Sequence, residues 1–466
     1  MTQFDDDIIS GSILKSVWKI SWPVIVTQLI TGLGGIIDQI LVGRYVGFEA
    51  QAAVGISWQS FLVLLVFLSS FFHGMNIQIA QYSGRRDSKS VNRVFFETVK
   101  ASLYSFFFVI APLGYFLSPF VLEIVTPTQE IYDYALPYLR LLFVATLPLF
   151  LMFILNGAFQ SVGNPKIPLY FGIITTATKI AVSYTLVSGS FGFPAMGAMG
   201  PAVGTCIAPL PSVLIALILI ARHKVLIGLP EKLSFRPDMS VLVPIVKLGL
   251  PAGLQAVLLN VGGLVLLYYI GTLAAGAEAV AAYTICYGQL FTVVTWVGFG
   301  LRAACATVMG QNIGAGKRDR GMHGVYLGVV VGFLWAGFFG IFYWFFAEQL
   351  LIPFGLDVHE EPIVVEYATT LLGYLAFSGM FVVMSLAFTG GLQGAGDTIK
   401  PMFIAFISQI VVLLGICTVY QLMGKLSTNV IWTAILISHL SRLTMSYIAF
   451  ASGKWRNINV EIGHDN

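Results

Sequence analysis

Five titratable side chains lie deep inside long apolar runs of this 466-residue sequence: Asp38, Lys179, Arg302, His439 and Arg442, with His73 as a sixth candidate. Asp38, in GGIIDQILVG (34–43), has no charged residue within five positions on either side. A charged side chain at a bilayer centre costs about 2.5–3.5 kcal/mol on insertion scales, so it usually faces a protein interior. We therefore expect these residues to mark an ion or substrate pathway.

The runs around them are typical of a membrane protein. Hydrophobic residues make up 57% of the chain and charged residues 10%, whereas soluble proteins carry about 25% charged residues. Runs of about 20 apolar residues, enough to cross a bilayer, recur along the whole chain. We expect twelve spans, near 17–42, 51–82, 93–119, 131–161, 167–190, 196–222, 240–270, 278–311, 322–347, 363–392, 399–423 and 430–452. The predicted fold class is an all-α polytopic membrane protein.

Lysine and arginine concentrate in alternate links, which indicates the orientation. They gather after spans 2, 6, 8 and 12, whereas the opposite links carry mainly acidic residues. We expect a multi-pass protein of the cytoplasmic (inner) membrane with both termini and all even-numbered links in the cytoplasm. The formal net charge of +3 is too small to suggest a nucleic-acid partner. The expected partners are the lipid bilayer and a small molecule, and we expect a monomer.

The two halves of the chain repeat one another. Pro23 in SWPVIVTQLITGLGGIIDQILVG aligns with Pro251 in GLPAGLQAVLLNVGGLVLLYYIG, and IAQYSGRRD (79–87) aligns with MGQNIGAGKRD (309–319). NGAFQSVGNPKIP (156–168) aligns with TGGLQGAGDTIKP (389–401). Six spans separate the copies, so both halves have the same orientation, as in parallel transporter repeats.

This repeat divides the chain into an N-terminal six-helix lobe (1–225), a cytoplasmic linker (226–239) and a C-terminal six-helix lobe (240–466). Two like-oriented bundles around a central cavity are typical of transporters that alternate access by rocking one bundle against the other. Leu266 occupies the position of Asp38 in the second half, so the carboxylate belongs to the first lobe alone.

The duplicated anchors resemble the multidrug and toxic-compound extrusion (MATE) family, within the MOP flippase superfamily. The resemblance spans residues 15 to 450 and includes P-x14-D-x4-G (Pro23, Asp38, Gly43) and GQNIGAGKRDRG (310–321). It implies a V-shaped pair of six-helix lobes that exports amphipathic, often cationic compounds in exchange for H⁺ or Na⁺.

The resemblance also implies a cation site in the first lobe. Asp38 matches the family's span-1 aspartate and Asn156 its span-4 asparagine. Thr205 matches the span-6 threonine of that site, and Tyr138 fits its span-4 tyrosine. Span 5 departs from the family's N-x3-D pattern, because Lys179 stands for the asparagine and Ser183 for the aspartate. The exchange removes one negative charge and adds a positive one on a single helix face.

We therefore predict that Lys179 occupies the place of the coupling cation and pairs with Asp38, and that H⁺ rather than Na⁺ is the coupling ion. No other cofactor, metal site or catalytic residue is expected. Arg302 in span 8 is the competing partner; arginine does not deprotonate, so it would act only as a counter-ion. Alternatives are a structural role for Asp38 at a bend of span 1 and a Lys179 side chain that snorkels to the interface.

The predicted function is secondary active antiport that exports amphipathic or cationic small molecules, as in multidrug and xenobiotic efflux, and not enzymatic catalysis. Weaker candidates for the substrate cavity are Met152, Phe159, Met384, Phe388, Asn260 and Gln255. The alternatives are a flippase of lipid-linked or polar lipids and a facilitator that has lost ion coupling. A membrane-embedded enzyme would need a cluster of catalytic residues near one interface, and the deep polar residues are instead dispersed over spans 1, 5, 8 and 12.

Overall fold

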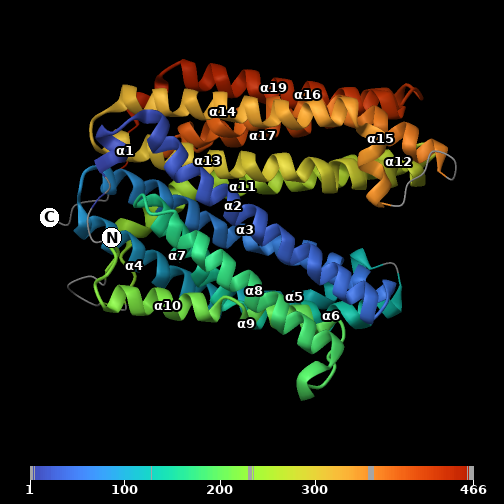
Figure 1. The fold of residues 1–466 in the computed structure, drawn as a ribbon, viewed down its shortest axis with the longest axis horizontal. Helices are drawn as coiled ribbons and strands as arrows, with labels where there is room; N and C mark the ends of the chain where they lie inside the picture. Colours follow the sequence, from blue (N-terminus) through green and yellow to red (C-terminus); the bar gives the residue numbers. More distant parts are fainter. Residues whose placement is uncertain are drawn as a thin grey trace. The chain divides into compact units, whose positions relative to one another are not determined.

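The computed structural model describes residues 4, 6–126, 128–228, 234, 236–354, 361–458 and 460, apart from the side chains of residues 48 and 63–69. All regular structure in these ranges is helical (Figure 1). Lipid offers no hydrogen-bond partners, so a lipid-exposed segment must pair its own backbone N–H and C=O groups. A helix does this within a single segment. The predicted all-α class is confirmed.

Each predicted span coincides with one helix or with helices that follow one another along the chain. The first half contains α2 (Ile13–Tyr45), α3 (Phe48–Gly84), α4 (Ser88–Ser105) with η1 (Phe106–Ile110) and α5 (Ala111–Val125), α6 (Gln129–Ala145), α7 (Leu147–Ser161), α8 (Lys166–Ser188), α9 (Met199–Ile207) and α10 (Leu210–Ala221). The second half contains α11 (Met239–Gly271), α12 (Gly276–Tyr283) with η3 (Thr284–Leu290) and α13 (Phe291–Gly314), α14 (Arg318–Phe345), α16 (Pro362–Gly394), α17 (Ile399–Ala405) with η5 (Phe406–Leu414) and α18 (Gly415–Leu422), and α19 (Thr428–Ala451).

Among the described residues, ten helices are long and apolar enough to cross a membrane. The helices α6 and α7, bent by 52° at the break before Leu147, add an eleventh if the bent pair counts as one span. The 37-residue helix α3 coincides with the remaining predicted span. The chain is therefore a multi-pass membrane protein, and the total of twelve spans stays a prediction.

The repeat is visible in the turns that end corresponding helices. After α7, Gly163 N–H donates to Gln160 O and Asn164 N–H to Phe159 O. After α16, Gly396 N–H donates to Gln393 O and Asp397 N–H to Leu392 O in the same pattern. Gly163 and Gly396 have φ of 90° and 93°, a left-handed conformation that glycine adopts without a steric penalty.

The chain forms two compact units. Unit 1 contains Val26–Gly253, and unit 2 contains Asp7–Ile25 and Leu254–Asn459. The chain therefore passes from one unit to the other inside α2 and again inside α11, in each case two residues after the aligned proline, Pro23 or Pro251. The lobe boundaries drawn from the sequence stay a prediction, and residues 229–233 and 235 of the predicted linker lie outside the described ranges.

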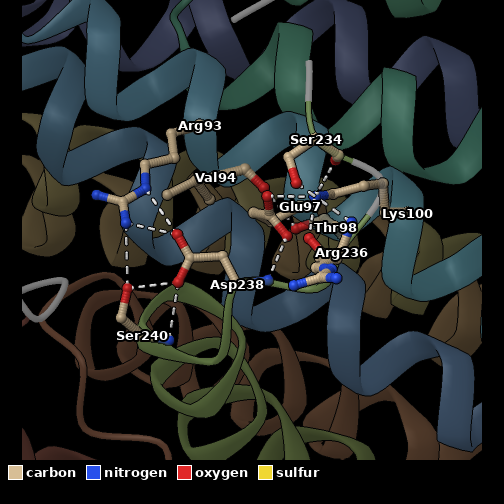
Figure 2. A network of polar contacts seen from close by, with 9 residues as sticks. All are labelled: Arg93, Val94, Glu97, Thr98, Lys100, Ser234, Arg236, Asp238 and Ser240. Carbon is tan, nitrogen blue, oxygen red and sulfur yellow. Dashed lines mark hydrogen bonds and ion pairs between the residues drawn. The ribbon is translucent and has the colours of Figure 1, made fainter. Parts of the chain in front are cut away.

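The segment that precedes α11 is bound to α4 within unit 1 (Figure 2). Lys100 Nζ donates to the carbonyls of Ser234 (2.7 Å) and Arg236 (2.9 Å), while Glu97 Oε2 accepts from the Asp238 N–H at 3.0 Å. Arg93 Nε donates to Asp238 Oδ2 at 3.0 Å. Side chains of α4 therefore fix the point at which the second half of the chain begins.

The segment that precedes α2 is held in a comparable way within unit 2. Asn312 Nδ2 and Arg320 Nε both donate to Ile8 O at 3.3 Å, and an Arg320 Nη2 hydrogen bond to Gly11 O measures 2.6 Å. In the first half, side chains of α4 thus bind the segment that leads into α11. In the second half, side chains at the end of α13 and the start of α14 bind the segment that leads into α2.

Candidate functional site

Asp38 and Lys179 form an ion pair between α2 and α8, with Lys179 Nζ 2.8 Å from Asp38 Oδ2. The Asp38 side chain is 7% exposed and the Lys179 side chain 20%. Both residues belong to unit 1. The structure therefore contains the predicted contact, while its part in ion coupling stays a prediction.

Two glycines, which the sequence did not identify as site residues, let α8 approach its neighbours here. A Cβ on Gly34, one turn before Asp38, would lie 3.3 Å from Thr176 Cγ2 and 3.8 Å from Lys179 Cδ. A Cβ on Gly204 of α9 would lie 2.5 Å from Ser183 Oγ and 3.4 Å from Lys179 O. The absence of side chains at these positions gives the Lys179 stem and Ser183 their space.

Several buried oxygen atoms of the predicted site residues form no hydrogen bond among the described residues. They are Asp38 Oδ1, Ser183 Oγ and Asn156 Oδ1. Buried polar atoms are normally hydrogen-bonded, and the exceptions need an explanation such as a functional role or an ordered water. Ser183 nevertheless lies close enough to interact with the Asp38 carboxylate, although neither Asp38 Oδ1 nor Ser183 Oγ forms a hydrogen bond of normal geometry among the described residues. Asp38 therefore has one oxygen bound to Lys179 and a second that can accept a proton or a closer hydrogen bond.

Tyr138 and Thr205 lie in the same unit. Tyr138 is 3% exposed and near enough to Asp38 and Cys206 for electrostatic interaction. Thr205, the neighbour of Cys206 on α9, is 6% exposed. Neither Thr205 nor Asn156 forms a hydrogen bond with Asp38 or Lys179 among the described contacts, so the wider site stays a prediction.

The remaining predicted residues are distributed over both units. In unit 2, the Arg302 guanidinium lies 5.7 Å from the centre of the Phe299 ring, and its pairing with Asp38 stays a hypothesis. Met152 and Phe159 are buried in the core of unit 1, and Phe388 in that of unit 2.

The last three cavity candidates differ in their surroundings. Gln255 accepts a hydrogen bond from Gln393 Nε2 at 3.0 Å, Asn260 is exposed and donates to Ala256 O, and Met384 is half-buried. A role of any of these residues in a substrate cavity stays a prediction.

Repeated membrane-spanning helices define a polytopic helical membrane protein, and the buried ion pair marks a candidate ion pathway within it. The chain belongs to the MatE family, because the sequence model of that family matches residues 23–185 and again residues 251–419. The two matches begin at Pro23 and Pro251, the prolines that the internal repeat aligns. The predicted family is thereby confirmed.

Curated relatives cover nearly the whole chain. A probable multidrug resistance protein NorM of Thermotoga maritima is 25% identical over 449 residues, which is 95% of this chain and 93% of that protein. The probable multidrug resistance protein YoeA of Bacillus subtilis is 24% identical over 399 residues, 84% of each protein.

Solved structures share the fold. One is described as the outward-facing conformation of a multidrug resistance MATE family transporter of the MOP superfamily, with a TM-score of 0.88 and 18% identity over 97% of this chain and 98% of that one. Another is a MOP superfamily transporter from Pyrococcus furiosus whose binding pocket is described as having reverse polarity. Its TM-score is 0.89 at 17% identity, over 97% of this chain and 98% of that chain.

Proposed function

We propose that this chain is a secondary active exporter that releases amphipathic or cationic small molecules in exchange for inward H⁺. The multidrug resistance relatives support export of such compounds. The observation that supports H⁺ as the coupling ion is the Asp38–Lys179 pair, in which the second carboxylate oxygen accepts no hydrogen bond of normal geometry among the described residues. We place the protein in the cytoplasmic membrane, as a monomer with both termini in the cytoplasm.

The pair has no net charge while Asp38 is ionised and Lys179 is protonated. A proton that binds Asp38 Oδ1 removes the negative charge and leaves the ammonium without its partner. An uncompensated charge at a buried pair costs about 3–5 kcal/mol. A free-energy change of this size is enough to shift a protein between two conformations that differ by a few kcal/mol.

Sodium is the less suitable ion for this site. Na⁺ needs several oxygen ligands, whereas the carboxylate oxygen already binds the Lys179 ammonium at 2.8 Å. A second cation bound beside that ammonium would meet electrostatic repulsion, which is strong where water is scarce. A proton adds to the carboxylate without needing a coordination shell.

The test is efflux of a cationic dye from proteoliposomes with a pH gradient or a Na⁺ gradient imposed separately. We expect the pH gradient alone to drive dye efflux by the wild type. We expect this proton-driven efflux to be lost in Asp38→Asn. Loss is also expected in Lys179→Ala, because both partners are needed for the switch. Proton-driven export that survives in Lys179→Ala but not in Asp38→Asn would contradict the pairing.

Two other outcomes lead to the alternatives. Efflux that follows the dye gradient and ignores both ions would make the protein a facilitator. Movement of fluorescent lipid between leaflets, without dye export, would make it a lipid flippase. Drive by Na⁺ without H⁺ would overturn the proposed role of Lys179.

A further inference from the structure

Arg140 on α6 lies inside a predicted span without an acidic partner. Its guanidinium carbon lies 4.5 Å from the centre of the Tyr115 ring on α5. Among the residues that the structure describes, its Nε is buried without a hydrogen-bond partner and no carboxylate forms an ion pair with it. Arginine stays protonated in proteins, so this helix carries a positive charge that the described residues do not neutralise.

The half-buried Arg140 lies at an apolar, exposed surface of unit 1. Tyr115 is 40% exposed, and Phe116, whose ring centre lies 5.6 Å from that of Tyr115, is 68% exposed. Tyr138, which is near Asp38, is buried on the other side of α6, because two residues along a helix differ by about 200°. The guanidinium therefore faces lipid rather than the candidate coupling site.

An exposed carboxylate lies two turns away on the same face of α6. Asp133 precedes Arg140 by seven residues, which places both on one side of the helix, about 10 Å apart along its axis. Gln129 Nε2 donates to Asp133 Oδ1 at 2.9 Å, and Oδ2 accepts no hydrogen bond among the described contacts. Pro137, between the two, has no N–H to donate to the Asp133 carbonyl. The face thus presents one cation and, nearer the helix start, two oxygen acceptors.

The separation of these groups fits the headgroup layer of a bilayer. This polar layer is about 5–8 Å thick on each side of the hydrocarbon core. Asp133 lies in the second turn of α6, and Arg140 lies two turns deeper. Long side chains on a helix lean toward its N-terminus, so the guanidinium extends toward Asp133 and shortens the gap. The two charges therefore span the layer, with Asp133 at its water side and the guanidinium at its apolar side.

We propose that this face of α6 binds the headgroup of a zwitterionic phospholipid that carries a primary ammonium group. The guanidinium fork binds two oxygens of the phosphate, and the single charge of a phosphodiester is neutralised by one arginine. The ammonium donates hydrogen bonds to Asp133 Oδ2 and to the Asp133 carbonyl. With both termini in the cytoplasm, as proposed above, this lipid belongs to the outer leaflet.

Three lipids that differ only in the headgroup test the proposal. The purified full chain in detergent is titrated with phosphatidylethanolamine, phosphatidylcholine or phosphatidylglycerol of the same acyl chains, and native mass spectrometry measures the affinity of the first bound lipid. The trimethylated ammonium of phosphatidylcholine has no N–H to donate, and phosphatidylglycerol has no ammonium. We expect the wild type to bind phosphatidylethanolamine about tenfold more tightly than phosphatidylcholine, because only its ammonium donates charged hydrogen bonds.

Two variants separate the two halves of the headgroup. Arg140→Gln removes the phosphate ligand and should weaken binding of all three lipids about tenfold. Asp133→Asn removes the negative charge, so it should weaken phosphatidylethanolamine binding to the level of phosphatidylcholine and strengthen phosphatidylglycerol binding. A merely structural change would move all three affinities in the same direction. The matched control is Arg44→Gln, which removes an exposed arginine in the last turn of α2, also in unit 1, and should leave the three affinities unchanged.

Equal binding of phosphatidylethanolamine and phosphatidylcholine by the wild type would overturn the proposal, and so would unchanged lipid binding in Arg140→Gln. Inorganic phosphate, added at the lipid concentration, distinguishes a lipid from a free anion: displacement of the bound lipid would overturn the lipid assignment. If Arg140→Gln does not fold, as judged by its thermal denaturation, the exposed Asp133→Asn decides through its opposite effects on two lipids. Binding in detergent needs no ion gradient, so the result does not depend on the proposed H⁺ coupling.

Discussion

Lys100 and Glu97, three residues apart on α4, form an ion pair at 2.6 Å with side chains only 6% and 8% exposed. Each partner also binds backbone of the segment that leads into α11. A buried charge pair is tolerated when further hydrogen bonds satisfy both ions. Here the remaining bonds come from residues more than 130 positions away, so the pair joins α4 to the beginning of the second half.

Removal of one member of this pair should destabilise the protein strongly. We expect Glu97→Gln or Lys100→Met to lower the free energy of unfolding by about 3–5 kcal/mol, because the other charge stays buried and uncompensated. The double variant should lose less than the sum of the two single losses. Thermal denaturation in detergent measures these changes. The control Lys425→Met removes an exposed lysine and should alter stability by less than about 0.5 kcal/mol. Additive losses in the double variant would show that the two charges do not interact.

The segment that precedes α11 should bind α4 less tightly in acid. Burial opposes ionisation of Asp238, but hydrogen bonds from Ser240 and Arg93 and the charge of Arg93 outweigh it and lower the pKa of Asp238. A lowered folded-state pKa means that the stabilisation is complete above the unfolded value of about 4 and is lost as pH falls through the folded value. Limited proteolysis of this segment should therefore accelerate below about pH 4.

In Asp238→Asn, the segment that precedes α11 should already be cleaved faster at neutral pH. Its cleavage rate should also depend less on pH than in the wild type. The control is Asp319→Asn, which removes the 73%-exposed carboxylate paired with Arg456. Cleavage of the α11 leading segment in that variant should follow the wild-type curve. A wild-type curve that stays flat down to pH 3 would contradict the role of the Asp238 carboxylate.

Restoring the family pattern in span 5 should change the coupling ion. The double variant Lys179→Asn/Ser183→Asp recreates N-x3-D and places a second carboxylate on the α8 face near Asp38. We expect dye export that responds to a Na⁺ gradient, which the wild type should not show. Lys179→Asn alone is the control, since it removes the ammonium without adding the second carboxylate. A double variant that folds but stays insensitive to Na⁺ would mean that other residues exclude the ion.

Close packing of α8 and α9 should be sensitive to a single methyl group. Gly204→Ala places Cβ 2.5 Å from Ser183 Oγ and 3.4 Å from Lys179 O, so either the helices or the hydroxyl must shift. Such overpacking typically costs about 1–3 kcal/mol, and we expect lower thermal stability and reduced export. Gly35→Ala is the matched control, because a Cβ there has no atom within 4 Å. It should stabilise the helix slightly, by about 0.5–1 kcal/mol. Equal behaviour of the two variants would contradict the importance of this contact.

Much of the helical architecture could be predicted from the sequence. The positions of the spans follow from runs of apolar residues, a local property that does not depend on what each helix packs against. The break between α6 and α7 was not predicted, because the apolar run continues through Thr146 and Leu147 while the helix bends there. The family and the repeat also follow from the order of residues.

The sequence by itself determined that Asp38 is an isolated carboxylate of the first half and that Lys179 replaces an uncharged residue of the family pattern. It left open whether Lys179 or Arg302 binds Asp38, since both lie more than 100 positions away. Only the tertiary structure decided that Lys179 reaches Asp38. The same holds for two facts about the described residues: the second Asp38 oxygen accepts no hydrogen bond of normal geometry, and the hydrogen-bond partners of Arg442 are neutral. Those facts depend on how α2, α8, η5 and α19 pack, and packing between distant helices is a property of three-dimensional contacts rather than of neighbouring residues.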